Sequence, residues 1–140
     1  MAHQEDYVSF EQAQMLKELG FKEKCFAFYT CLGNLEINHL TFSGQHIKLE
    51  NYNDDSINEK YKNVSFSAPT LSQVQKWLRK KGMIVLAGYE PYKYWLIEND
   101  GPKWKYYINS KDSIHHSMAE FDSYEQALSA GIDKALCFKH

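Results

Sequence analysis

The alternation of apolar and polar residues predicts three helices, each of which begins with the same polar signal. Apolar residues recur on one side of each segment at the three- to four-residue spacing of an α-helix. The three segments are residues 10–19, 70–81 and 124–136. A Ser or Thr at each start is followed three residues later by Gln, the capping-box arrangement that satisfies amides of the first helical turn. The three capping residues are Ser9, Thr70 and Ser123. Gly20 and Gly82 end the first two helices.

Shorter apolar and aromatic runs between these helices predict strands. The runs are residues 25–31, 35–42, 64–66, 83–89, 92–97 and 104–108, with a further short strand at 46–50. Asp100-Gly101 followed by Pro102 is a strong turn signal, so we expect 92–97 and 104–108 to pair as an antiparallel hairpin. Polar composition predicts an exposed loop at 44–63, a loop at 109–122 and a frayed end at 1–7.

The order of these elements predicts an α+β fold. We expect a single domain over residues 1–140, in which an antiparallel sheet of four to six strands carries about three helices packed mainly on one face. A chain of 140 residues buries enough surface to fold without a metal or a disulfide. Gly131 lies inside the third helix, where it costs about 1 kcal/mol relative to Ala. It indicates either a close approach of that helix to a sheet or simple tolerance.

Aromatic content and charge distribution are the unusual features of the composition. Aromatic residues make up 15% of the chain, and 10 of them are Tyr, which favours half-buried faces with one wet end. The net charge is −2, but residues 68–109 alone carry seven basic and three acidic side chains. A duplex-binding protein is usually basic overall, so duplex nucleic acid is disfavoured as a partner. A local basic strip suits a small anionic ligand, an acidic protein partner or an ordinary solvated face.

The cysteines and the hydropathy bear on location. Three cysteines without framework spacing, Cys25, Cys31 and Cys137, are typical of free thiols in a reducing compartment. No apolar run reaches the length of a membrane span, and residues 1–10 lack the apolar core of a secretion signal. We therefore expect a cytoplasmic protein, of a cell or an infected host, without a membrane partner.

Three segments carry a resemblance to other proteins. SFEQAQMLKELGF at 9–21, APTLSQVQKWLRKK at 68–81 and FDSYEQAL at 121–128 look like those of uncharacterised short proteins of Bacteroides-type gut bacteria, their prophages and phages. These motifs are mostly helix caps and buried stripes. The resemblance therefore implies a fold and an origin, and it assigns no activity or site residue. A phage link would favour an accessory or counter-defence binding protein.

A basic strip and an aromatic hairpin form the candidate binding surface. Cations lie along one side of the second helix, although the helix dipole alone accounts for cations near a C-terminus. Lys and aromatic residues then alternate along the predicted hairpin, which suits stacking on a flat anion but equally suits cross-strand packing. The candidate ligand-binding residues are Lys76, Arg79, Lys80, Lys93, Trp95, Trp104, Lys105, Tyr106 and Tyr107.

Motifs for metals, phosphate loops and hydrolases are missing from the sequence. No CxxC, HxxxH, HExxH, GxGxxG, P-loop or GxSxG spacing occurs, so we expect neither a metal nor a cofactor. On a regular strand Cys25 and Cys31 lie too far apart to share a metal ion. The adjacent His115 and His116 would point in different directions, and no local signal gives them a role.

These observations predict a non-catalytic accessory protein, and the resemblance implies that it is related to phages. It would bind an anionic or nucleotide-like ligand, or an acidic protein patch, through the aromatic and basic surface. The alternative is a homo-oligomeric interaction module whose open aromatic face pairs with its own copy, as in a homodimer. A third hypothesis is a thiol-dependent enzyme that uses Cys25 or Cys31 with a distant His, which nothing local supports.

Overall fold

The computed structural model describes residues 7–37, 49–54, 65–89 and 103–138. These residues fall into two compact units, one within residues 7–70 and the other within residues 71–138, which we call the first and second units. The expectation of a single domain stays a prediction, because a division into compact units does not decide whether they unfold together.

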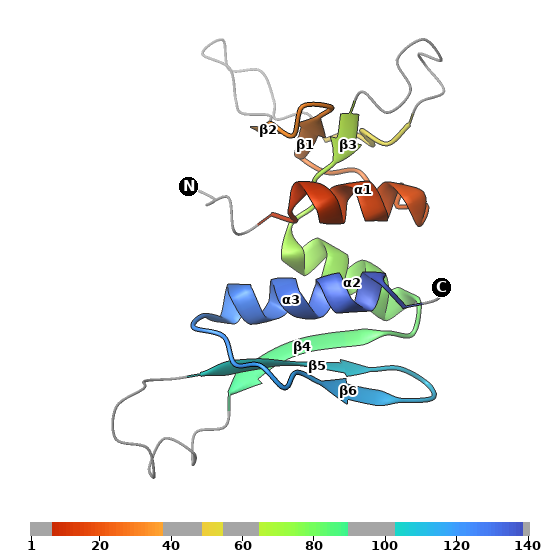
Figure 1. Ribbon diagram of the computed structural model, residues 1–140. Coiled ribbons are helices and arrows are strands. Elements are labelled where there is room, and N and C mark those ends of the chain that lie inside the picture. Colours follow the sequence, from red (N-terminus) through yellow and green to blue (C-terminus); the bar gives the residue numbers. More distant parts are fainter. Residues whose placement is uncertain (1–6, 38–48, 55–64, 90–102, 139–140) are drawn as a thin grey trace. The chain divides into compact units, whose positions relative to one another are not determined.

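The fold class is α+β, as the sequence predicts. The described residues form three helices and six strands (Figure 1). The prediction of one sheet is wrong, because the strands form two separate antiparallel sheets of three strands, ordered β2-β1-β3 and β4-β5-β6. Hydrophobic patterning locates strands but does not name their partners, and here each strand pairs only within its own unit.

The first unit packs one helix on its sheet. It consists of α1 (Phe10–Glu18), β1 (Ala27–Thr30), β2 (Leu35–Ile37) and β3 (Ser65–Ser67). The capping box is confirmed: the Ser9 hydroxyl accepts from the Gln12 amide at 3.1 Å, and Gln12 Oε1 accepts from the Ser9 amide at 2.9 Å. The Phe10 ring lies 5.5 Å from the Tyr29 ring and 5.7 Å from the Phe66 ring, which joins the helix to two strands.

The segment Leu49–Asp54 belongs to this unit and corrects part of the predicted loop at 44–63. Glu50 pairs with Cys25 through backbone hydrogen bonds of 2.9 and 3.2 Å. The Tyr52 amide donates to Ser67 Oγ at 2.9 Å, and the Ser67 amide donates to Asn53 Oδ1 at 2.8 Å. Polar side chains thus satisfy the backbone here in place of a regular ladder. The predicted frayed end at 1–6, residues 38–48 of the predicted strands and loop, and the loop residues 55–63 lie outside the described residues.

The second unit places two helices on a three-stranded sheet. It consists of α2 (Leu71–Lys80), β4 (Ile84–Tyr89), β5 (Trp104–Asn109), β6 (Ile114–His116) and α3 (Tyr124–Leu136). Figure 1 shows α2 and α3 on the same side of this sheet. The fully buried side chains of this core include Val74, Leu78, Val85, Ile108, Leu128 and Ile132.

The pairing predicted for residues 104–108 is wrong. β5 is a central strand: β4 pairs along one edge of it from Trp104 to Asn109. β6 pairs with Tyr107 to Asn109 on the other edge, and Phe121 bridges to Trp104 there. The predicted strand at 92–97 lies outside the described residues. β6 also lies within the predicted loop 109–122. A strand of three exposed residues is too short to produce a recognisable hydrophobic pattern.

Candidate functional site

The two faces of the β4-β5-β6 sheet differ in what covers them. Val85 and Ile108 face α2 and α3 and are 0% exposed. Their neighbours in sequence point the other way, because side chains alternate along a strand. On that side Ile84, Leu86 and Ile114 are 40%, 44% and 76% exposed. We call the described side chains of this surface the open face: Ile84, Leu86, Lys105, Tyr107, Asn109, Ile114 and His116.

Strand register arranges the open face in rows that run across the sheet. Leu86 lies opposite Tyr107, and Tyr107 lies opposite His116. In the next row Asn109 lies between Ile84 and Ile114. Directly opposed residues lie close enough for their side chains to touch. The rows therefore form a continuous surface that is aliphatic along β4 and at Ile114, with Tyr107 and Asn109 at its centre and His116 at its β6 edge.

Gly88 shapes the other end of the open face. It lies opposite Lys105, and a β-carbon at Gly88 would stand 3.8 Å from the Tyr107 ring. One edge of the half-buried Tyr107 ring therefore lies near the backbone of Gly88. Lys105 stands beside it with no side chain opposite.

The charge of the open face has one sign. Lys105 is its basic residue, and His116 is exposed beside Tyr107. None of the described strand residues that face this side is acidic. At the rim, the Asp122 carboxylate is held by Lys103 Nζ at 2.9 Å. The arrangement favours an acidic partner over a basic one.

The structure separates the nine predicted site residues. Lys105 and Tyr107 lie on the open face. Trp104 and Tyr106 face α3 instead: the Trp104 ring packs edge-on against Tyr124 at 5.6 Å, and Tyr106 packs against Gly131. These two side chains are therefore half-buried beneath α3 and do not belong to the open face.

The three predicted cations of α2 form a separate surface. Lys76, Arg79 and Lys80 are exposed, opposite the buried stripe of that helix, as the spacing predicts. Since α2 covers the other side of the sheet, they do not join the open face. Lys93 and Trp95 lie outside the described residues.

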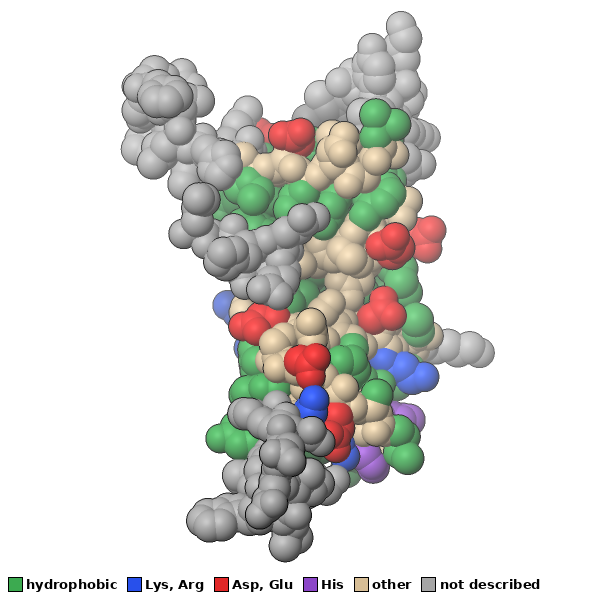
Figure 2. All heavy atoms as spheres, turned by 60° about the vertical axis from the view of Figure 1, so that its left-hand side comes forward, with side chains coloured by type: hydrophobic (Ala, Val, Ile, Leu, Met, Phe, Trp, Pro, Cys, Tyr) green, Lys and Arg blue, Asp and Glu red, His purple; other side chains and the backbone are tan. Residues whose placement is uncertain are grey.

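The histidines and thiols are also dispersed. His115 points toward the helices, where its ring lies 5.0 Å from Phe138, while His116 is on the open face. Figure 2 shows histidine side chains beside hydrophobic ones. Cys31 and Cys137 are exposed, whereas Cys25 is buried. Among the described residues no three His, Cys, Asp or Glu side chains gather as a metal site would require.

The environment of Cys25 suppresses its chemistry. Burial raises the pKa of the Cys25 thiol, against smaller lowering effects of hydrogen bonds from Ser67 and two backbone groups. The thiol also donates to the Ala27 carbonyl at 3.2 Å. Only the thiolate is a strong nucleophile, so this site holds Cys25 in its unreactive form near neutral pH.

Sequence reasoning missed the aliphatic part of the open face. Ile84, Leu86 and Ile114 are ordinary members of apolar runs, and which face each occupies depends on pairing. The available signal was the unbroken apolar run of β4. Such a run is typical of strands that are covered on both faces.

Comparisons with known proteins add no constraint. No family model, curated protein or solved structure matches this chain. The resemblance to short Bacteroides-type and phage proteins therefore stays a prediction. No helix in the described segments is both long and apolar enough to cross a membrane.

Proposed function

We propose that this protein is a non-catalytic accessory protein that binds an acidic protein surface through the open face. One observation carries the proposal: three large aliphatic side chains stand exposed on a sheet face whose charged groups are basic. The resemblance to phage and prophage proteins is consistent with an accessory role.

Apolar and basic groups have different tasks on such a surface. Ile84, Leu86 and Ile114 supply apolar area, whose removal from water drives association. Lys105 supplies charge, which steers an acidic partner and rejects basic ones. Tyr107 offers a rigid ring with a polar end, a residue type enriched where proteins bind each other.

Placing a negative charge on the open face tests the proposal. Proteins retained by the immobilised chain would be identified, prepared in pure form and titrated against wild type, Lys105→Glu and Leu86→Glu. An acidic partner should lose about tenfold or more in affinity to each variant. Lys76→Glu on α2 is the matched control and should change affinity less than about twofold. The proposal would be wrong if the protein that binds with the highest affinity is basic. It would also be wrong if neither open-face substitution changes that affinity.

Self-association is the second candidate. The row Ile84–Asn109–Ile114 carries no charge, so it can meet its own copy without like-charge repulsion. Light scattering over a wide concentration range separates the candidates. A monomer throughout excludes self-association, and a dimer that Leu86→Glu dissociates would replace the acidic-partner proposal.

A further inference from the structure

One end of the second unit contains a hollow whose lining residues do not belong to the open face. Four segments meet there: the turn between α2 and β4, the turn between β5 and β6, β6 itself and the residues after α3. The hollow has a volume of about 520 Å³, within the range of small-molecule sites. We call it the turn hollow, and its polar and aromatic lining is Lys81, Ser110, Lys111, Ser113, His115 and Phe138.

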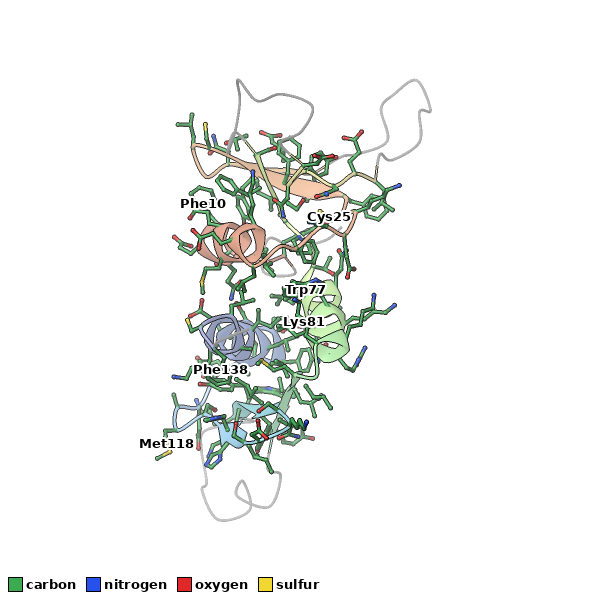
Figure 3. The ribbon with its side chains drawn as sticks, turned by 90° about the vertical axis from the view of Figure 1, so that its right-hand side faces the viewer. Phe10, Cys25, Trp77, Lys81, Met118 and Phe138 are labelled. Carbon is green, nitrogen blue, oxygen red and sulfur yellow. The ribbon has the colours of Figure 1, made fainter. Side chains whose placement is uncertain are left out.

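The lysines of the turn hollow are not neutralised by carboxylates. Neither Lys81 nor Lys111 forms an ion pair in the described part of the chain. Lys81 Nζ lies 4.5 Å from the centre of the Trp77 ring, and this cation–π contact restrains the ammonium group (Figure 3). Asp112 is the carboxylate among the described lining residues, set against two lysines and a histidine.

A chain of hydrogen-bonding groups lines the same hollow. The Ser110 and Ser113 hydroxyls are 3.0 Å apart, and Ser113 Oγ is 3.2 Å from His115 Nε2. The Ser110 amide donates to the Ser113 carbonyl at 2.9 Å, which fixes the turn that carries both hydroxyls. The Phe138 ring packs against His115 and gives the hollow an apolar wall.

Helix electrostatics explain only part of this charge. α2 ends beside the hollow, and a helix C-terminus favours nearby cations such as Lys81. Its last carbonyls are already capped, since Gly82 (φ +87°) and Met83 donate to Arg79 and Leu78. Lys111 and His115 belong to the hairpin of β5 and β6 and not to a helix, although His115 packs on Phe138 just after the end of α3.

We propose that the turn hollow binds the phosphate group of a small molecule. Two lysines supply charge-assisted donors, His115 and the serine hydroxyls complete the set of hydrogen bonds, and Phe138 packs on the apolar part of the ligand. This site is separate from the open face and does not depend on its proposed function.

Inorganic phosphate and adenosine monophosphate serve as probes. Each is titrated into the isotope-labelled full chain at low ionic strength, and binding is monitored through the amide chemical shifts. Both should shift residues 81–83 and 110–115, and the nucleotide should also shift Phe138. Lys111→Ala should weaken binding about tenfold, the loss expected for one charge-assisted hydrogen bond. Asp112→Asn should strengthen it, because it removes the repelling carboxylate.

Lys76→Ala, an exposed lysine of α2 outside the hollow, is the matched control and should change binding less than about twofold. Equal losses in Lys76→Ala and Lys111→Ala would show general charge attraction and overturn the site. The absence of any shift in residues 81–83 and 110–115 of the wild type would overturn it as well. Because Lys111 and Asp112 are exposed turn residues, the thermal unfolding of each variant is expected to match wild type.

Discussion

A β-carbon placed on Gly131 would stand 2.8 Å from the β-carbon of Tyr106 and 3.0 Å from Cγ1 of Val85. Real β-carbons essentially never approach that closely, so α3 rests on the sheet at a point where only hydrogen fits. Of the two explanations that the sequence leaves open for Gly131, close approach is confirmed.

Gly131→Ala should therefore destabilise the protein. An alanine in a helix ordinarily adds about 1 kcal/mol of stability over glycine, whereas overpacking costs about 1–3 kcal/mol, so we expect a net loss of up to about 2 kcal/mol. Chemical denaturation measures the change in free energy of unfolding. Asp133→Ala, at an exposed position of the same helix, is the control and should have little effect. Tyr106→Ala should not rescue Gly131→Ala, because the contact is with the β-carbon that alanine keeps. A stabilised Gly131→Ala protein would contradict the close approach.

The local parts of this fold could be read from the sequence. The caps at Ser9 and Ser123 and the glycine stop at Gly82 depend only on neighbouring residues, and each is found. Strand partners could not be read, because they depend on contacts between distant segments. Alternation along residues 104–108 already places Trp104 and Tyr107 on opposite faces, but it does not say which of the two faces the helices cover. The turn hollow was hidden for the same reason, since its residues come from four separate segments.

The Ser117 side chain forms hydrogen bonds with the backbone of β5 and of residue 119, just after the end of β6. It is buried, its Oγ accepts from the Tyr106 amide at 3.2 Å, and it donates to the Ala119 carbonyl at 2.9 Å. Ser117→Ala leaves both backbone groups without these partners and should cost about 1–3 kcal/mol. The free energy of unfolding from denaturant titration checks this value. Ser72→Ala, on the exposed side of α2, should stay within about 0.5 kcal/mol of wild type.

The three thiols should react at different rates. Cys31 and Cys137 are exposed, whereas Cys25 is 2% exposed and burial raises the pKa of its thiol. An alkylating reagent at neutral pH should modify the two exposed thiols and leave Cys25 until the protein unfolds. Mass spectrometry of digested protein reads each site. Rapid modification of Cys25 in the native protein would revive the thiol-dependent hypothesis.

The same burial predicts a loss of stability in alkali. The folded state holds the Cys25 proton more tightly than the unfolded state, because burial raises the pKa of this thiol. Its contribution is therefore fully present below the pKa of an unfolded cysteine, about 8.5, and is lost as the pH rises through the folded pKa. The free energy of unfolding should fall above that pH. Cys25→Ala should flatten the fall, whereas Cys31→Ala should not. A slope unchanged by Cys25→Ala would contradict the assignment.

Val85 and Leu86 are neighbours in β4 that face opposite sides of one sheet, and a pair of substitutions distinguishes the two faces. Val85 is 0% exposed beneath the helices, so Val85→Ala should cost about 2 kcal/mol through lost burial and a cavity. Leu86 stands on the open face, so Leu86→Glu should change the free energy of unfolding by less than about 0.5 kcal/mol. Denaturant titration of both variants tests the orientation of the sheet before any partner is known. If Leu86→Glu destabilises the isolated protein as much as Val85→Ala, then part of this chain already covers the open face, and it is not a docking surface.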